Sequence, residues 1–206
     1  MNTLIALSGY AQTGKDTIAE ILVNEKGYER RAFADVLRQM LYALNPIVGN
    51  TRRVQDMVDE FGWDKAKAEP EVRALLQRMG TEAGREVLGE NVWVDFTLRN
   101  LAPKTVITDC RFPNEAMATK DRGGFVVRVE RPGVVAVNEH SSDSALDDWP
   151  FDYVLPNSSS LERLRERTIS MVERLEKLGT DTCRTEEASQ KYWKAVADDG
   201  LFRVDL

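Results

Sequence analysis

A segment near the amino terminus, Gly-Tyr-Ala-Gln-Thr-Gly-Lys-Asp-Thr at residues 9–17, constrains the fold of this chain more than any other feature. It follows the short apolar run of residues 3–8 and precedes apolar residues at helical spacing from Ile18 to Leu22. The pattern predicts a strand, a glycine-rich turn and a helix. Such a turn offers successive backbone N–H groups and the positive end of a helix dipole to phosphate groups. The segment therefore predicts a nucleoside triphosphate site.

The residues of this loop also predict how a triphosphate is held. Gly9 and Gly14 permit the turn, and Lys15 is placed to reach the β- and γ-phosphates. The usual pattern ends in Ser or Thr, which ligates Mg²⁺, but here Asp16 follows the lysine and Thr17 comes next. We expect Asp16 to contact Mg²⁺ through water, the alternative being that Asp16 faces away and Thr17 takes its place. The predicted triphosphate-binding residues are Gly9, Ala11, Gln12, Thr13, Gly14, Lys15, Asp16 and Thr17.

The rest of the chain alternates between strand and helix patterns. The predicted strands cover about residues 28–34, 104–108, 124–130 and 152–155. The predicted helices cover about residues 35–44, 70–88, 92–101, 113–122 and a segment that begins with a capping box at Ser159–Glu162. Asp35 and Asn91 are expected to cap their helices, and Gly89 is expected to end one. This alternation predicts an α/β fold in three layers, with a central parallel sheet flanked by helices.

The length of 206 residues fits one domain with a small appendage. We expect residues 1–180 to form this domain and residues 181–206 to form a C-terminal helical appendage. Within the domain, residues 131–150 lack a sustained period and predict a flap or lid, in which His140 is expected to be solvated.

Composition argues against several classes of partner. The chain has 28 basic and 34 acidic residues, a net charge of -6, which disfavours binding to a nucleic acid polymer. Cys110 and Cys183 form neither a metal-ligand spacing nor a disulfide framework. The sequence has no apolar run near the roughly 20 residues of a membrane helix, so no membrane partner is expected. These features predict a cytoplasmic protein.

A second group of charged residues follows the predicted strand at 104–108. Because ligands bind at the carboxyl ends of parallel strands, Asp109 is expected beside the phosphate loop as a second carboxylate for Mg²⁺. Arg111 brings a permanent positive charge within two residues of it. The alternatives are that Asp109 only caps a helix or turn, and that Arg111 only forms a surface ion pair with Glu115.

Several motifs occur in a fixed order along the chain. They are Gly14-Lys15-Asp16-Thr17, Phe33-Ala34-Asp35-x-Leu37-Arg38, Gly80-Thr81-Glu82-x-Gly84-Arg85-Glu86, Asp109-x-Arg111-Phe112-Pro113-Asn114-Glu115 and Arg128-Val129-x-Arg131-Pro132-Gly133. Together they resemble the deoxynucleoside monophosphate kinases encoded by phages. The resemblance extends from about residue 3 to residue 175, and in that family an aspartate after the lysine is usual.

The resemblance implies a P-loop kinase fold and transfer of the γ-phosphoryl group of ATP to a deoxynucleoside monophosphate (dNMP), giving ADP and dNDP with Mg²⁺. It implies a homodimer as one possible assembly, and the host cytoplasm if the chain is phage-encoded. The implied catalytic residues are Lys15, Asp109, Arg111 and Arg131. The implied dNMP-binding residues are Asp35, Arg38, Arg78, Glu82 and Arg85, and the implied metal-binding residues are Asp16 and Asp109.

Alternatives stay open at this point. Asp35 could be only a helix cap, Glu82 and Arg85 could pair along a helix, and strand alternation favours Arg131 over Arg128 as the lid cation. The acceptor could be another phosphorylated molecule, such as phosphomevalonate or dephospho-coenzyme A. The chain could also be a non-catalytic regulatory module that binds ATP.

Overall fold

The computed structural model describes residues 3–135 and 145–181 of the chain, with side chains as far as residue 178. Its centre is a parallel sheet of five strands in the order β2-β5-β1-β6-β7. The strands are β1 (Thr3–Ser8), β2 (Glu29–Arg31), β5 (Lys104–Ile107), β6 (Phe125–Glu130) and β7 (Tyr153–Pro156). The predicted parallel sheet is confirmed, and because the strands run the same way, their carboxyl ends meet at one edge.

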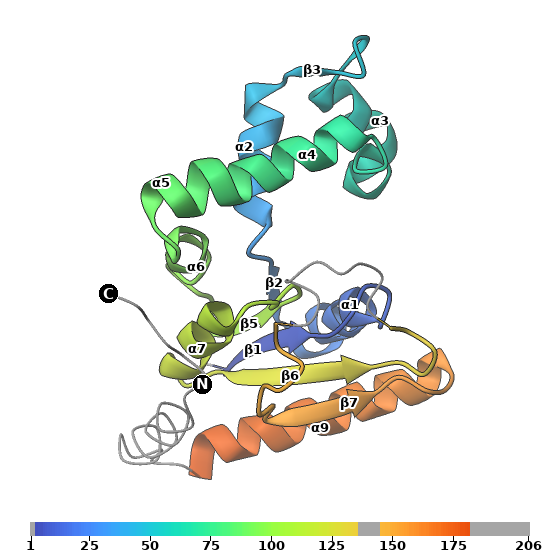
Figure 1. Cartoon of the computed structure of the whole chain (residues 1–206). Helices are drawn as coiled ribbons and strands as arrows, with labels where there is room; N and C mark the ends of the chain where they lie inside the picture. The colour runs from blue at the N-terminus through green and yellow to red at the C-terminus, as the bar shows by residue number, and fades with distance from the viewer. Residues whose placement is uncertain (1–2, 136–144, 182–206) are drawn as a thin grey trace.

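Helices cover both faces of this sheet (Figure 1). They are α1 (Lys15–Lys26), α6 (Val92–Thr97), α7 (Pro113–Asp121) and α9 (Leu161–Asp181). Alternation along β1 assigns the faces, because Ile5 and Leu7 pack with α1 and α9, whereas Leu4 and Ala6 pack with α6 and α7. The three-layer fold class is therefore confirmed.

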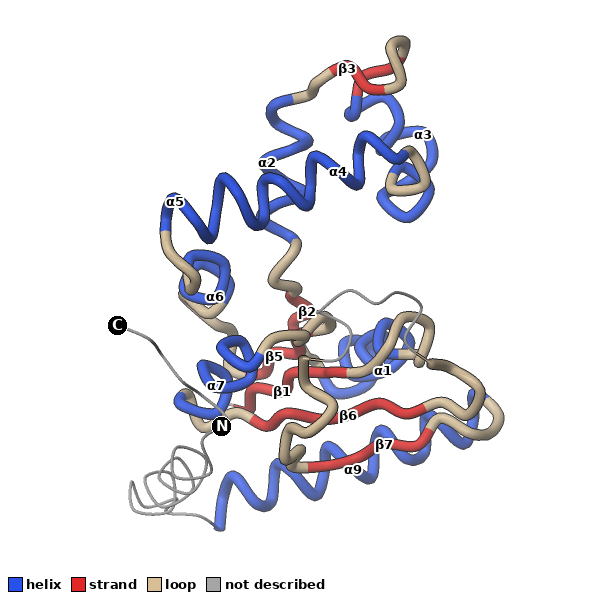
Figure 2. The backbone as a smooth tube through the Cα atoms, viewed as in Figure 1, coloured by secondary structure: helices blue, strands red, loops and turns tan. Residues whose placement is uncertain are grey.

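Between β2 and β5 the chain forms a helical lobe that the sequence did not predict as a unit. Its elements are α2 (Asp35–Leu44), β3 (Ile47–Val48), β4 (Arg52–Arg53), α3 (Val54–Ala66), α4 (Pro70–Arg78), the π-helical turn η1 (Met79–Arg85) and α5 (Glu86–Leu88). Buried Leu41, Val48, Val54 and Val72 give this lobe its own small core. Figures 1 and 2 show the lobe standing over one side of the sheet layer.

Two predicted helices differ in detail from the observed ones. The helix predicted at 70–88 is one helical run, but its middle is the π-helical η1, and Gly89 follows it with a φ of 105°. The helix predicted at 92–101 ends at Thr97. Asn91 does not cap it through its side chain, because its amide oxygen accepts a hydrogen bond from Asn114 Nδ2 at 3.0 Å.

Two predicted caps also need correction. Asp35 is the first residue of α2 and not its cap, and its carboxylate accepts a hydrogen bond from the backbone N–H of Ala32 at 2.9 Å. At the start of α9 the capping hydroxyl belongs to Ser160, which accepts from the N–H of Arg163 at 3.3 Å, and not to Ser159.

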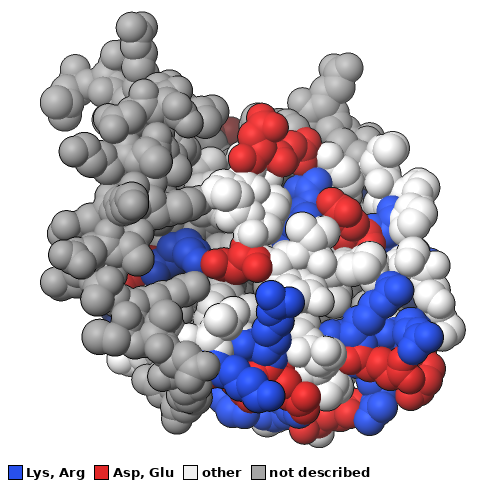
Figure 3. Space-filling model, turned by 90° about the horizontal axis from the view of Figure 1, so that it is seen from below, with Lys and Arg blue, Asp and Glu red and all other residues white. Residues whose placement is uncertain are grey.

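The outer surface of α9 is held to α1 by ion pairs. Arg165 pairs with Glu25 at 2.7 Å, and Lys26 pairs with Glu173 at 2.8 Å. Figure 3 shows basic and acidic side chains interspersed on the face seen from below Figure 1, the side on which α9 lies. Within the described residues, no helix is both long enough and apolar enough to span a membrane.

Parts of two predicted segments lie outside the described residues. Residues 136–144 of the predicted flap, with His140, are among them, as are residues 182–206 of the predicted appendage. The flap within the domain, the appendage and the boundary at about residue 180 therefore stay predictions.

Candidate active site

The loop between β1 and α1 has the backbone of a tight cradle. Gly9, Gln12 and Gly14 all have positive φ, at 137°, 65° and 103°. A Cβ atom on Gly9 would lie 2.5 Å from the backbone oxygen of Val129, and one on Gly14 would lie 2.5 Å from Asn157 Nδ2. Side chains are thus excluded at both glycines, which lets the loop pack against the ends of β6 and β7.

If the loop binds ATP as the sequence predicts, replacement of Gly9 by alanine is expected to weaken that binding about tenfold. It is also expected to destabilise the fold by about 1–3 kcal/mol, because the added methyl group overlaps a backbone carbonyl that cannot move alone. Gly27→Ala is the matched control. Gly27 also has positive φ, 69°, but nothing lies within 4 Å of its added Cβ. The control should cost about 1 kcal/mol of stability and leave ATP affinity unchanged. Titration calorimetry measures the ATP affinity and thermal unfolding measures the stability. Equal ATP affinity in the two variants would contradict the prediction that this loop binds a triphosphate.

Lys15 lies across this loop. Its buried Nζ donates to the backbone oxygens of Gly9 at 2.6 Å and Tyr10 at 2.7 Å. Burial, with the positive charge of Arg111 as the next cause, lowers the pKa of Lys15 to about 8. A phosphate group near this ammonium would offset both effects, so the site is electrostatically prepared for an anion.

The other loop residues differ in exposure. Thr13 is buried, and its hydroxyl donates to Tyr10 O at 2.9 Å, whereas Ala11 and Gln12 are exposed. Asp16 is exposed in the first turn of α1, and Thr17 is half-buried. In the described ranges there is no group of three or more His, Cys, Asp or Glu side chains that could hold a metal ion.

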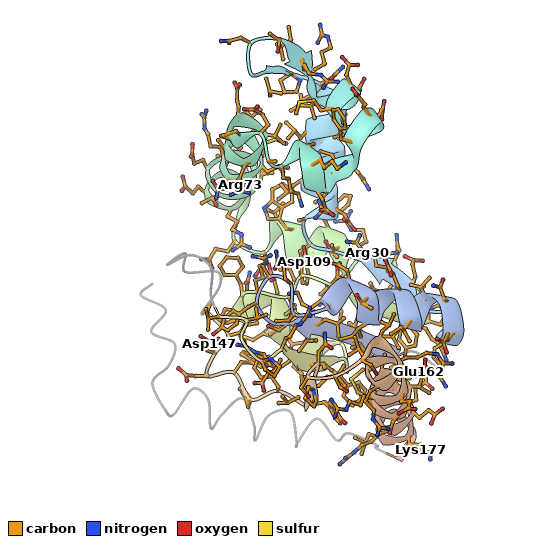
Figure 4. The ribbon with its side chains drawn as sticks, turned by 90° about the vertical axis from the view of Figure 1, so that its right-hand side faces the viewer. Arg30, Arg73, Asp109, Asp147, Glu162 and Lys177 are labelled. Carbon is orange, nitrogen blue, oxygen red and sulfur yellow. The ribbon has the colours of Figure 1, made fainter. Side chains whose placement is uncertain are left out.

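Asp109 follows β5 at the same edge of the sheet and is half-buried. Its Oδ1 accepts from the N–H of Phe33 at 2.7 Å and its Oδ2 from the N–H of Ala34 at 3.0 Å. Burial raises the pKa of Asp109, although these two hydrogen bonds and the charge of Arg111 oppose the rise. The carboxylate therefore ties the end of β5 to the start of the helical lobe, and Figure 4 shows it near Arg30 at this junction.

Glu115, the last residue of the Asp109–Glu115 motif, carries a buried carboxylate. Its Oε2 accepts from the backbone N–H groups of Arg111 at 2.8 Å and Phe112 at 3.1 Å. Its Oε1 lies 3.2 Å from a guanidinium nitrogen of Arg85. Burial raises the pKa of Glu115 to about 7. The predicted alternative, a surface ion pair between Arg111 and Glu115, is thus replaced by a buried contact with the backbone of Arg111.

The predicted acceptor residues Asp35 and Arg38 lie together at the start of α2. Asp35 pairs with Arg38 at 3.1 Å and with Arg30 at 2.7 Å, and Arg30 also donates to the Thr108 hydroxyl at 3.2 Å. Nε of Arg38 is buried and has no hydrogen-bond partner among the described residues. Because a buried donor without an acceptor is costly, this atom suits an anion bound at the junction.

The structure separates the other predicted acceptor residues. Arg78 and Glu82 form an exposed pair with each other at 3.3 Å, with 69% and 59% of their side chains accessible. Arg85 packs over the ring of Phe112 at 4.2 Å and pairs with Glu115. The alternative predicted from the sequence, an ion pair between Glu82 and Arg85, does not form. Glu82 pairs with Arg78, and Arg85 pairs with Glu115.

Lys67 is a residue that the sequence reasoning missed. It follows α3 and is half-buried, and its pKa is lowered by burial first and then by the positive charge of Arg38. Asp109 and Arg111 also act on it electrostatically. The lysine is thus within electrostatic range of Arg38 and Arg111, although no sequence motif contains it.

A pocket of about 480 Å³ lies beside the phosphate loop. Its lining residues are Tyr10, Thr13, Arg128, Val129, Glu130, Arg131, Pro132, Gly133, Val134, Pro156 and Ser158. Arg131 reaches the loop, with its NH1 3.4 Å from Gln12 O. Arg128, which strand alternation disfavoured, stacks over the ring of Tyr10 at 4.7 Å and pairs with Asp147 at 2.9 Å. Both arginines are therefore at the pocket, and the reasoning that set Arg128 aside was incomplete.

Comparisons with known proteins identify the family to which this chain is similar. Residues 48–168 match the family model described as deoxynucleotide monophosphate kinase. A protein of Acanthamoeba polyphaga mimivirus, provisionally named a deoxynucleotide monophosphate kinase, is 29% identical over 192 residues, covering 82% of this chain and 96% of the viral one.

Solved structures that align with the chain include other kinases. Shikimate kinase from Aquifex aeolicus has a TM-score of 0.42 and 12% identity, with 82% of this chain and 96% of that one covered. Dephospho-CoA kinase from Campylobacter jejuni has a TM-score of 0.39 and 14% identity, with 85% and 97% covered.

The family match includes three of the five motifs, those at Gly80–Glu86, Asp109–Glu115 and Arg128–Gly133, and spans more than half of the chain. The resemblance drawn from the motifs is confirmed, and the chain belongs to the deoxynucleotide monophosphate kinase family.

Proposed function

We propose that the protein transfers the γ-phosphoryl group of ATP to a dNMP, giving ADP and a dNDP. The observation that carries this proposal is a run of cations across the junction between sheet and helical lobe. Arg111 acts electrostatically on both Lys15, in the phosphate loop, and Lys67, which shares its surroundings with Arg38. Transfer between two phosphates needs positive charge on both sides of the migrating group and at its centre, and in this proposal Lys15, Lys67 with Arg38, and Arg111 would supply it.

On the donor side, the loop N–H groups and Lys15 would hold the β- and γ-phosphates of ATP. The neighbouring pocket of about 480 Å³ has a size suited to a nucleoside, and its arginines at 128 and 131 would lie near the phosphates. Arg131 would add positive charge from the segment where the predicted flap begins.

On the acceptor side, Arg38 would bind the phosphate of the dNMP through its buried Nε, with Asp35 holding the guanidinium in place. Lys67 would add a second charge to that phosphate. The predicted contributions of Arg78, Glu82 and Arg85 to the dNMP site stay proposals. No general base is needed, because the attacking phosphate oxygen is already an anion.

The donor set at the loop fits Mg²⁺. Asp16 and Thr17 offer oxygen atoms beside the phosphate position, and Mg²⁺ retains several waters, so it does not need a cage of three carboxylates. Asp109 would contribute through the lone pairs that its two backbone hydrogen bonds leave unused. The bound ion would neutralise charge on the β- and γ-phosphates.

A coupled ADP-release assay tests the proposal. The full chain is given ATP and Mg²⁺ with each common dNMP, the ribonucleotide counterparts, phosphomevalonate and dephospho-coenzyme A. We expect only nucleoside monophosphates to accelerate ADP release, with a dNMP the best of them. Acceleration by another acceptor, or ATP turnover that no acceptor changes, would replace the proposal with one of its alternatives. A homodimer and a cytoplasmic location stay predictions.

Replacement of Lys67 by methionine is expected to raise the KM for the dNMP about tenfold and to leave the KM for ATP unchanged, because the lost charge acts electrostatically on Arg38, the proposed ligand of the acceptor phosphate. Lys65→Met is the matched control, since Lys65 is an exposed lysine at the end of the same helix, α3. Steady-state kinetics with each substrate varied in turn measures the effect. An unchanged dNMP KM in Lys67→Met would remove Lys67 from the site.

A further inference from the structure

The π-helical turn η1 interrupts a helical run that extends from Pro70 to Leu88. A π segment holds one more residue per turn than an α-helix, so it shifts every later side chain around the axis and leaves backbone groups that need other partners. Such turns are rare in proteins, but those that occur are often found at functional sites. The turn carries buried Gly80 and Gly84, and it ends at Arg85.

Trp93, from α6, fills the π turn. The indole Nε1 donates to the backbone oxygen of Gly80 at 2.8 Å, and this hydrogen bond is buried. A Cβ atom on Gly84 would lie 2.1 Å from Cζ2 of the same indole. The ring is therefore in direct contact with the Gly84 backbone, and any side chain at position 84 would overlap the indole. In Figure 1 the helical run lies over α6.

Arg85 is the last residue of the π turn, and its side chain contacts the segment Asp109–Glu115. Its guanidinium lies 4.2 Å above the Phe112 ring and 3.2 Å from Oε1 of Glu115. The other oxygen of Glu115 accepts the N–H groups of Arg111 and Phe112. Only 4% of the Glu115 side chain is exposed, against 23% for Arg85, so the pair is shielded from water and salt.

We infer that Trp93 is a positioning residue for phosphoryl transfer. By holding the π turn, it places Arg85 on Glu115, and Glu115 in turn fixes the backbone from which the Arg111 side chain extends. The role given to Arg111 rests on the proposed function, whereas the contacts from Trp93 to the Arg111 backbone do not. Arg85 then acts through Glu115 and need not touch the dNMP.

Two variants of the full chain test this inference. Trp93→Phe keeps an aromatic ring but removes the donor to Gly80, and Gly84→Ala adds a methyl group against the indole. Val87→Ala is the control, because Val87 lies on the following helix α5 with 73% of its surface exposed. We expect both test variants to lower kcat about tenfold and to leave the KM for ATP within about twofold of wild type, since the phosphate loop is untouched. Trp93→Phe is the milder change and serves if Gly84→Ala does not fold.

Hydrogen exchange at the backbone N–H groups of Arg111 and Phe112 provides a second readout that needs no substrate. We expect it to be about tenfold faster in the test variants than in Val87→Ala, because Glu115 would no longer be held by Arg85. A purely structural role for Trp93 would lower the melting temperature while kcat and this exchange matched the control, and that result would overturn the inference. If wild type phosphorylated no dNMP, the proposed function would fail, but the exchange measurement would still decide whether Trp93 controls the Arg111 backbone.

Discussion

Lys15→Met is expected to lower kcat/KM for ATP by about two to three orders of magnitude while the protein stays folded. The Lys15 ammonium is buried and donates to the oxygens of Gly9 and Tyr10 at 2.6 and 2.7 Å, so it is held at the mouth of the loop where the β- and γ-phosphates would bind. Burial and the positive charge of Arg111 both disfavour the charged form of Lys15, and they lower its pKa to about 8. Methionine has a similar length without the charge, so it removes the stabilisation of the transferred phosphoryl group and also relieves the cost of burying a cation.

Lys26→Met is the matched control for this experiment. Lys26 lies at the other end of α1 and pairs with Glu173 on α9, so its loss changes the net charge equally but leaves the loop alone. Steady-state kinetics and thermal unfolding on both variants separate catalysis from stability. Full activity of Lys15→Met would remove the phosphate loop from the mechanism and, with it, the assignment of a triphosphate site.

The elements of the sheet layer could be predicted from local pattern. The apolar run of β1, the turn that follows and the helical spacing of α1 are each encoded within a few consecutive residues, and the structure has all of them. The place of Asp109 beside the loop followed from a general property of parallel sheets, because the carboxyl ends of neighbouring strands meet at one edge.

The helical lobe could not be predicted in the same way. Its hairpin has strands of two residues each, too short for a period-two pattern. Helix α3 contains Gly62 with a φ of 77°, which breaks the helix and its apolar spacing. The π turn leaves no local signal beyond Gly80 and Gly84, since the shift it causes depends on Trp93 arriving from another helix.

Of the charged residues at the site, one outside any motif was missed and one within a motif was set aside. Lys67 follows α3, and only the folded chain brings it within electrostatic range of Arg38, Asp109 and Arg111. Strand alternation put Arg128 on one face with Glu130, but it could not show that this end of β6 lines the pocket beside the phosphate loop. Local pattern therefore predicted the phosphate loop and Asp109, whereas the surroundings of Lys67 and Arg128 depend on tertiary structure.

Arg111 is the residue for which we expect the largest loss. Its guanidinium acts electrostatically on Lys15, on Lys67 and on Asp109, and under the proposed function its charge would lie between the two phosphates. A cation in that place stabilises the charge that spreads over the equatorial oxygens of the migrating phosphoryl group, and such an arginine contributes about three to five orders of magnitude to kcat. Arg111→Ala should therefore lower kcat by about three orders of magnitude and change both KM values little.

Two further measurements show whether the effect belongs to the guanidinium itself. Arg111→Lys retains the charge but loses the planar set of donors, so its kcat should fall between those of wild type and Arg111→Ala. Guanidinium ion added to Arg111→Ala should restore part of the lost kcat, whereas the same concentration of sodium ion should not. The fold should be unchanged in both variants. Glu115 binds the backbone N–H of residue 111, and alanine and lysine both have this N–H group. A rise in the dNMP KM at unchanged kcat would contradict the assignment and would make Arg111 a ligand of the acceptor phosphate instead of the group that stabilises the transfer.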